Sequence, residues 1–174
     1  MKKTKNSSDK ATAPAAVRLS QGHPLAEELR PGQSVELLQE LHILTREGRL
    51  NQDSRRKLKQ VYHLFNFIEP LLKELSVDGH APTLADHGAG KSYLGFILYD
   101  LYFKALGRGH IYGIEWRAEL VEKSRALAQR LAFGRMSFLN LSVAASTEAA
   151  GLPERIDVVT ALHACDTATD DAIA

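Results

Sequence analysis

A glycine-rich turn between an apolar strand and an apolar helix limits this chain to a small number of folds. The residues TLAD at 83–86 are typical of a short buried strand, the loop HGAGKS follows, and residues 93–106 predict a helix that is apolar almost all round. Such a helix has to be covered on every side, because no face of it suits water. We expect a sheet to cover one side and helices from residues 34–76 to cover another.

Strand and helix patterns alternate after this turn. Further strands are predicted at residues 110–115, 136–141 and 156–162, and an amphipathic helix at 117–131. This alternation is typical of parallel strands joined by right-handed crossovers. The predicted fold class is α/β, with a Rossmann-like parallel sheet and helices on both of its faces.

The amino-terminal part divides into a tail and a helical segment. We expect residues 1–30 to form a mobile tail, because they begin with a polar, Lys-rich stretch that has almost nothing to bury, and residues 31–80 to form a helical amino-terminal segment. Ser34 and Asp53 stand where helix caps are expected. Pro70 is expected to kink the second helix or split it in two.

The third unit, residues 81–174, is a predicted Rossmann-like domain that we expect to be incomplete. Its fourth strand would lie beside the first and lack an outer neighbour, and a helix capped by Thr167 or Thr169 would stop at Ala174. We therefore expect the carboxyl-terminal half of the sheet to be missing and the sequence to be the front part of a longer protein.

Composition excludes few partners. The formal net charge is +1, which favours neither nucleic acid nor an anionic membrane. No apolar run approaches the roughly 20 residues that span a bilayer. The single cysteine, Cys165, cannot form an internal disulfide, which fits a reducing compartment. We expect a cytoplasmic protein with no membrane partner, and the sequence does not indicate an oligomeric state.

Three classes of ligand use a glycine turn of this kind. A dinucleotide would need a third glycine at position 93, where Tyr93 stands instead. A phosphate loop is favoured by Gly90, Lys91 and Ser92, but Ala85 takes the place of its leading glycine, and no later strand ends in the aspartate that would hold magnesium. The third class needs an acid, a glycine turn and a second acid on the neighbouring strand.

Asp86, Gly88, Gly90 and Glu115 fit the third class. The two acids end adjacent parallel strands at the carboxyl edge of the sheet, where open α/β sheets bind their ligands. The glycines permit a tight turn and a close approach of the main chain to a ligand. Because the carboxylate of Glu115 can accept hydrogen bonds from both hydroxyls of a ribose, the sequence predicts a site for an adenosine with an unphosphorylated ribose.

These motifs carry a family resemblance. LADHGAGKSYLGFIL resembles the first motif of class I methyltransferases, and IYGIEW resembles their ribose-binding strand. Together with RRKLKQVYHLFNFIEPLL and ALHACDTATDDAI, they make residues 50–174 similar to a methyltransferase-like group that includes ribosomal-RNA-adenine-dimethylase-domain-containing proteins and their bacterial relatives. Ser92 departs from the pattern, since the family usually has a third glycine there.

The resemblance implies S-adenosylmethionine as the cofactor and gives roles to five residues. Asp86 would lie near the methionine amino group, Gly88 and Gly90 would line the cofactor, Glu115 would hold the ribose, and Trp116 would border the adenine. Simpler interpretations stay open for three of them. Asp86 can cap the turn, Glu115 can be a solvated strand end, and Trp116 can belong to the core.

His163 and Asp166 are the candidate catalytic residues. They follow the fourth strand, where class I methyltransferases place the groups nearest the transferred methyl group, and either could accept a proton from the acceptor. With Cys165 they offer three donors, but a zinc site needs four, so we expect no metal. Lys91 and His87 are not assigned as ligands, because a solvated lysine and a histidine bonded to the backbone explain them as well.

The sequence thus predicts a methyltransferase dependent on S-adenosylmethionine, with an unidentified acceptor. The resemblance favours RNA as the acceptor, while protein and small molecules stay open because no aromatic-basic stretch of the kind that grips single strands is present. One alternative is a phosphate-loop nucleotide-binding protein. The other is a non-catalytic methyltransferase-like binding module.

Overall fold

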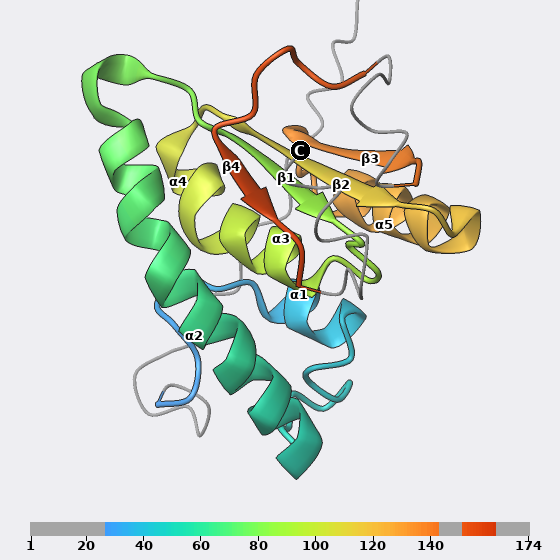
Figure 1. Ribbon diagram of the computed structural model, residues 1–174. Coiled ribbons are helices and arrows are strands. Elements are labelled where there is room, and N and C mark those ends of the chain that lie inside the picture. The colour runs from blue at the N-terminus through green and yellow to red at the C-terminus, as the bar shows by residue number, and fades with distance from the viewer. Residues whose placement is uncertain (1–26, 143–150, 163–174) are drawn as a thin grey trace, which may run out of the picture.

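A four-stranded parallel sheet organises the protein, whose computed structural model describes residues 27–142 and 151–162. The strands β1 (Thr83–His87), β2 (His110–Glu115), β3 (Met136–Asn140) and β4 (Val158–Thr160) lie in the order β3-β2-β1-β4 (Figure 1). Every neighbouring pair is parallel. The α/β class, the parallel sheet and the place of the fourth strand beside the first are therefore confirmed.

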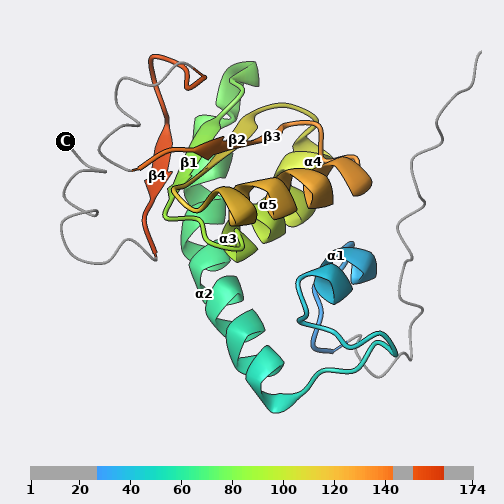
Figure 2. The same ribbon diagram turned by 90° about the vertical axis from the view of Figure 1, so that its right-hand side faces the viewer.

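The crossover helices lie on one face of the sheet. A continuous helical stretch of α3 (Tyr93–Leu98), η2 (Tyr99–Phe103) and α4 (Lys104–Leu106) joins β1 to β2, and α5 (Ala118–Arg130) joins β2 to β3. The chain moves from β1 to β2 and from β2 to β3 in the same direction across the sheet. Because both connections are right-handed, their helices lie on the same face of the sheet (Figure 2). In the described ranges the opposite face carries no helix, and the second helical layer that we predicted is not seen there.

The stretch from Tyr93 to Leu106 has the predicted extent but is not a uniform α-helix. Its middle segment, η2, is a π-helix, in which hydrogen bonds span one residue more than in an α-helix. The prediction that it is covered on every side is confirmed for residues 94–100, which are all buried, but Lys104 and Ala105 in the last turn are exposed. Each large apolar side chain that is buried in this stretch contributes roughly 1.5–3 kcal/mol when it leaves water.

The long helix α2 (Gln52–Leu75) packs against α3. Its apolar side chains recur every three or four residues, and the buried ones are Leu58, Val61, Phe65, Ile68 and Leu72. The prediction for Pro70 is wrong in one respect, because the helix runs unbroken through it. Proline removes one backbone hydrogen bond, and buried residues on both sides of it hold the helix against the core.

Two cap predictions had different outcomes. Ser34 caps α1 (Val35–Glu40), and its hydroxyl accepts a hydrogen bond from the amide of Leu37 at 3.2 Å. The cap of α2 is Asn51 instead of Asp53, because the amide oxygen of Asn51 accepts from Ser54 N–H at 2.8 Å. Asp53 lies in the first turn, where a negative charge interacts favourably with the helix dipole.

The amino-terminal segment is tied to the core by a buried carboxylate. Asp100, in η2, accepts a hydrogen bond from the backbone amide of Ser34 at 2.7 Å, and its side chain has no exposed area. Leu29 is also buried in the core, so packed structure begins inside the range predicted as a tail.

A short 3-10 turn, η1 (Val77–Gly79), leads from α2 into the sheet. No helix within the described residues combines the length and apolar character needed to cross a membrane.

Candidate functional site

The two predicted acids lie at the same edge of the sheet. In the parallel register of β1 and β2, Asp86 pairs with Gly113 and His87 pairs with Ile114, so Glu115 follows directly at the carboxyl end of β2. Asp86 and Glu115 are each only 4% exposed. A solvated strand end is therefore the wrong interpretation of Glu115.

The Glu115 carboxylate is held by four hydrogen bonds. It accepts from the amide of Gly90 at 2.8 Å, from the amide of Arg117 at 3.0 Å, and from the Arg117 guanidinium at 2.8 and 3.1 Å. Burial raises the pKa of Glu115, but the hydrogen bonds from Arg117 and Gly90 outweigh burial and leave the pKa below its ordinary value. This carboxylate is accordingly a fixed negative charge, and the glycine turn is attached to it.

The glycine turn has the backbone that its sequence predicts. Gly88 and Gly90 have φ angles of 63° and 57°, in the left-handed region that favours glycine. Ser92 has a φ of 52°, so the residue that departs from the family pattern occupies a conformation in which glycine would be unstrained. The hydroxyl of Ser92 is buried without a hydrogen-bond partner among the described residues.

The amides of this turn are used within the protein. The amide of Ala89 donates to Ile114 at 3.0 Å, that of Gly90 to Glu115, and that of Ser92 to Ala89 at 2.6 Å. A phosphate loop needs such amides free to point at phosphate oxygens, and it needs the serine hydroxyl open to magnesium. The geometry therefore disfavours the phosphate-loop alternative that Lys91 and Ser92 left open.

Asp86 is bonded to the edge strand. The hydroxyl of Thr160, in β4, donates to Asp86 Oδ1 at 2.8 Å. Burial raises the pKa of Asp86 to about 6, and the hydrogen bond from Thr160 offsets only part of that effect. A carboxyl with such a pKa changes its charge near physiological pH, which is a property often found at functional sites.

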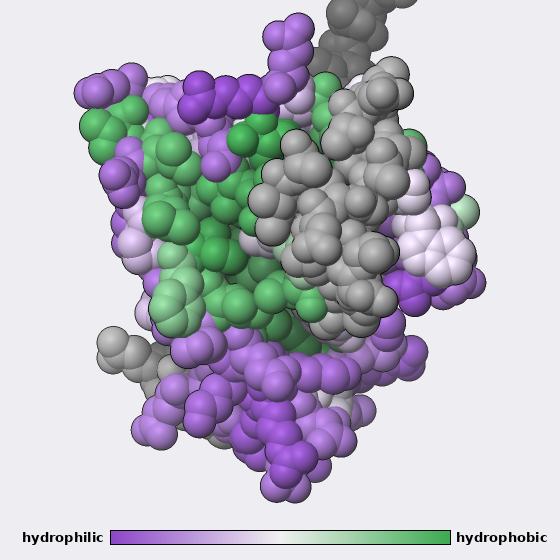
Figure 3. All heavy atoms as spheres, viewed as in Figure 1, coloured by the Kyte–Doolittle hydropathy of each residue, from purple (hydrophilic) through white to green (hydrophobic). Residues whose placement is uncertain are grey.

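A cavity of about 470 Å³ opens beside Asp86. We call it the α2 cavity, because one wall comes from that helix and the others from β1, the glycine turn, α3 and the end of β4; its lining is Lys57, Gln60, Val61, His63, Leu64, Asp86, Ala89, Tyr93, Leu94 and Leu162. Apolar side chains also gather on the surface between α2 and β4 (Figure 3). On α2 itself, Phe67 and Leu71 are more than half exposed. The cavity thus joins an apolar surface to a buried carboxyl.

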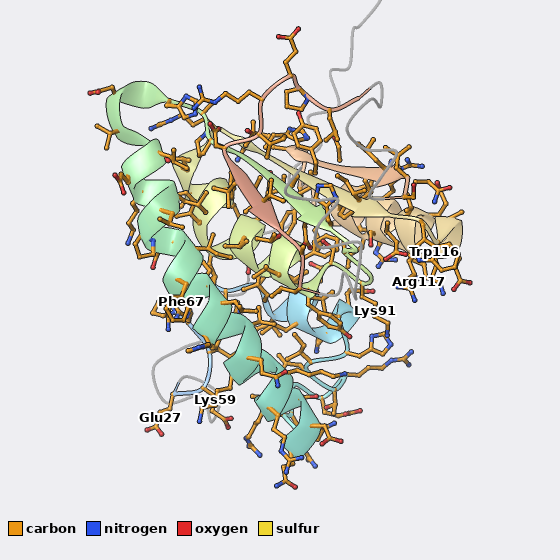
Figure 4. The ribbon with its side chains drawn as sticks, viewed as in Figure 1. Glu27, Lys59, Phe67, Lys91, Trp116 and Arg117 are labelled. Carbon is orange, nitrogen blue, oxygen red and sulfur yellow. The ribbon has the colours of Figure 1, made fainter. Side chains whose placement is uncertain are left out.

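Trp116 lies outside the core, with 71% of its surface exposed. The guanidinium of Arg117 lies 6.0 Å from its ring centre, and both side chains project from the same end of the sheet (Figure 4). Assignment of Trp116 to the core is therefore wrong. An exposed indole next to a buried acid can act as a platform for a flat ring.

His87 and Lys91 differ in their surroundings. His87 is 6% exposed, its Nδ1 has no hydrogen-bond partner among the described residues, and burial lowers its pKa. The backbone therefore does not satisfy this nitrogen in the part of the chain that the structure describes. Lys91 is exposed at the start of α3, on the same side of the molecule as Trp116 and Arg117 (Figure 4).

The predicted catalytic residues His163 and Asp166 lie outside the described residues, as does Cys165. Within residues 27–142 and 151–162, no three His, Cys, Asp or Glu side chains come together as a metal site. Sequence reasoning missed Arg117 and Thr160. The signal for Arg117 was its place two residues after Glu115. The predicted place of the fourth strand beside the first was the signal for Thr160, but only the register, in which Asp86 pairs with Thr160, singles it out.

Comparison with known proteins gives one family and a set of similar folds. A family model described as a methyltransferase domain matches residues 56–174. No curated protein matches the chain at a significant level. Among solved structures, "StiE O-MT residues 961-1257" is 17% identical with a TM-score of 0.42, and the alignment covers 76% of this chain and 42% of that one.

Magnesium protoporphyrin IX methyltransferase (ChlM) from Synechocystis PCC 6803 also matches in two structures. The structure with bound SAH is 19% identical with a TM-score of 0.42, covering 72% of this chain and 52% of that one. The structure with bound SAM is 17% identical with a TM-score of 0.44, covering 76% and 64%. This chain therefore spans between 42% and 64% of the length of these solved structures.

Proposed function

Because this chain belongs to the family of methyltransferase domains, we propose that it binds S-adenosylmethionine and transfers the methyl group to an acceptor. The observation that carries the proposal is the arrangement of Asp86 and Glu115. Two buried carboxylates end adjacent parallel strands, and a glycine turn between them is bonded to one of the acids through the Gly90 amide. Open α/β sheets bind their ligands at this edge.

Glu115 and Trp116 would hold the nucleoside part of the donor. The carboxylate of Glu115 can accept hydrogen bonds from the two ribose hydroxyls, and the exposed indole of Trp116 can lie against the adenine. Arg117 now uses two of the acceptor positions on Glu115. We infer that its guanidinium moves aside when the ribose binds, since its side chain is 46% exposed and has room in solvent.

Asp86 would face the methionine part of the donor, with Gly88 and Gly90 lining the space between the two ends. A carboxylate at Asp86 attracts the positive amino group, and that attraction favours its ionised form. The pKa of about 6 belongs to the protein without such a partner. Donor binding should therefore lower the pKa of Asp86.

The donor supplies an electrophilic methyl group on a sulfonium, which an acceptor displaces in one step. The protein has to align the acceptor with this methyl group and exclude water. His163 and Asp166 would accept the proton that the acceptor loses, as the family resemblance implies. The narrower resemblance to ribosomal-RNA-adenine-dimethylase-domain-containing proteins favours RNA as the acceptor, and a cytoplasmic location fits the single cysteine.

Calorimetric titration tests this proposal. S-adenosylmethionine should give a binding isotherm with the wild-type chain, and ATP with magnesium should give none. Lys91→Ala sharpens the distinction, because a phosphate loop loses its nucleotide without its lysine, whereas donor binding should change only modestly. Binding of ATP alone, abolished in Lys91→Ala, would overturn the proposal in favour of a phosphate loop.

A further inference from the structure

A second depression adjoins the α2 cavity. An open groove of about 880 Å³ lies along the amino-terminal half of α2, and we call it the basic groove; its lining is Glu28, Arg30, Arg55, Arg56, Leu58, Lys59, Gln60, Tyr62, His63 and Asn66. Gln60 and His63 line both the basic groove and the α2 cavity. The two hollows therefore meet at these residues, and we call the surface that runs from the basic groove over Gln60 and His63 to the α2 cavity and Asp86 the path.

Positive charge predominates along this path. The basic groove has four Arg or Lys side chains in its lining and one acid, Glu28, which is bonded to Arg55 at 2.6 Å. Arg56 is 70% exposed and lies 3.7 Å from Asp53, which is itself 85% exposed, so water screens that pair strongly. Lys59 makes no ion pair with any described residue. The local excess of positive charge contrasts with the chain's formal net charge of +1.

Exposed aromatic side chains lie on the same side of the helix. Lys59, His63 and Phe67 follow one another at intervals of four residues, which puts them on one helical face, and Lys59 and Phe67 project from the outer side of α2 in Figure 4. The rings of His63 and Phe67 contact edge to face at 4.9 Å, and Phe67 is 64% exposed. At the cavity, the ammonium of Lys57 lies 5.8 Å from the centre of the Tyr93 ring.

From this arrangement we propose that α2 is the acceptor-binding element, and that the acceptor is a single-stranded RNA. Phosphates lie along Arg56 and Lys59 in the basic groove, one base stacks on Phe67, and the target base enters the α2 cavity beside Asp86. The role of this surface in methyl transfer rests on the proposed function. Binding of the RNA itself does not.

RNA fits the path better than an acidic peptide does. Guanidinium and ammonium groups suit either anion, but the acidic side chains of such a peptide have no ring to stack on an exposed aromatic face, whereas every base does. The basic residues cluster at 55–59, whereas the exposed rings of His63 and Phe67 come one and two helical turns later, so the sequence shows no single stretch that holds both. Only the helical spacing of four residues brings them onto one face.

The test measures binding of a fluorescently labelled single-stranded RNA of mixed sequence, by anisotropy, over a range of salt concentrations. The charge-reversal variant Arg56→Glu with Lys59→Glu should weaken binding about 10-fold or more at low salt and reduce the slope of log Kd against log salt by about 2. Phe67→Ala should weaken binding about 5-fold or more and leave the slope unchanged. The different slopes separate phosphate contacts from stacking.

A matched control reverses the same number of charges elsewhere. Lys123→Glu with Arg155→Glu alters exposed residues on α5 and before β4, and it should leave RNA affinity within about 2-fold of the wild type. Equal losses in the two double variants would mean that only overall charge matters, and would overturn the proposal. Tight binding of polyglutamate in place of RNA would assign the surface to an acidic peptide, and binding of AMP as strong as that of RNA would exclude the phosphate contacts along α2.

Titration of each variant with S-adenosylmethionine distinguishes the two proposals. Donor binding without RNA binding in the wild type would make this inference wrong and leave the proposed function standing. RNA binding with the predicted losses, but without donor binding, would make the proposed function wrong and leave α2 as an RNA-binding surface. Unchanged donor affinity in the Arg56 and Lys59 variant also shows that the variant is folded.

Discussion

Arg117 donates three hydrogen bonds to the carboxylate of Glu115. Its backbone amide lies 3.0 Å from a carboxylate oxygen, and two guanidinium nitrogens lie 2.8 and 3.1 Å from the carboxylate oxygens. The two residues are separated by Trp116 alone, so this contact depends on the sharp exit of the chain from β2 into α5. The carboxylate keeps its charge through these bonds although it is 4% exposed. Under the proposed function, the ribose hydroxyls of the donor would replace the guanidinium as hydrogen-bond donors to this carboxylate.

Replacement of Glu115 by alanine should weaken binding of S-adenosylmethionine by about 1.5–3 kcal/mol, because charge-assisted hydrogen bonds to the ribose are lost. Glu115→Gln should lose less, since one acceptor oxygen remains. Glu119→Ala, an exposed acid in the first turn of α5, is the control and should bind the donor as the wild type does. Calorimetry gives the affinities, and unchanged binding by a folded Glu115→Ala variant would reduce Glu115 to a structural residue.

The pH dependence of stability should carry the signature of Asp86. Its native pKa is raised from 3.8 to about 6, so the folded protein binds more protons than the unfolded chain between those values, and the free energy of unfolding falls as pH rises through them. The loss amounts to about 3 kcal/mol for a shift of this size. The Asp86→Asn variant should not lose this stability as the pH rises. The Asp78→Asn variant, in which an exposed acid is changed, should lose as much as the wild type does.

Chemical denaturation at several pH values measures this difference. Comparison of each variant with the wild type cancels the contributions of all other groups. Parallel curves for the wild type and Asp86→Asn across the whole range would mean that Asp86 titrates normally. Addition of S-adenosylmethionine should flatten the wild-type curve, if the donor amino group lowers the pKa of Asp86 as proposed.

Ser92 should hold backbone strain that glycine relieves. Its φ of 52° and ψ of 39° lie in the left-handed region, where a side chain costs roughly 1–2 kcal/mol. We expect Ser92→Gly to be more stable than Ser92→Ala by about 0.5–1 kcal/mol, after the larger chain entropy of glycine is subtracted. Both variants remove the buried hydroxyl, so thermal unfolding of the pair isolates the backbone effect, and equal stability would mean that no strain is stored there.

Asp100 should matter for attachment of the amino-terminal segment. Asp100→Ala leaves the buried amide of Ser34 without its acceptor, and the free energy of unfolding should fall by about 1–3 kcal/mol. Asp100→Asn keeps an acceptor oxygen and should lose clearly less. Denaturant unfolding gives the free energies, and limited proteolysis near residue 34 should be faster in the alanine variant only; equal loss in both variants would point to the charge of Asp100 instead of its hydrogen bond.

The arrangement of the strands could be predicted because hydrophobic pattern and glycine placement agree. β2 has the predicted bounds, and the ends of β1, β3 and α5 differ from prediction by one residue each. Family comparison confirms the methyltransferase class and, with it, S-adenosylmethionine as the cofactor of that class. The narrower group and the acceptor stay predictions.

Local competition between neighbouring residues was harder to predict. Asn51 and Asp53 are both good helix caps, but Asn51 has the extended backbone of a cap, whereas Asp53 already lies in the first helical turn. The hydrogen bonds from Arg117 to Glu115 depend on the conformation of the arginine side chain, which the hydrophobic pattern of the sequence does not predict. The basic groove required two segments, residues 28–30 and α2, to come together in space.

The π-helical segment Tyr99–Phe103 determines which way the residues after it face, as well as the path of the crossover from β1 to β2. Each residue of an α-helix advances the chain by about 100° around the axis, so a π-turn reorients every side chain that follows it. Asp100 and Phe103, which have almost no exposed area, both lie within this segment. Deletion of a single residue here would let the stretch close as a uniform α-helix while the downstream apolar face still points at the sheet, whereas α-helical geometry with the present sequence would turn that face away by roughly a quarter of a circle.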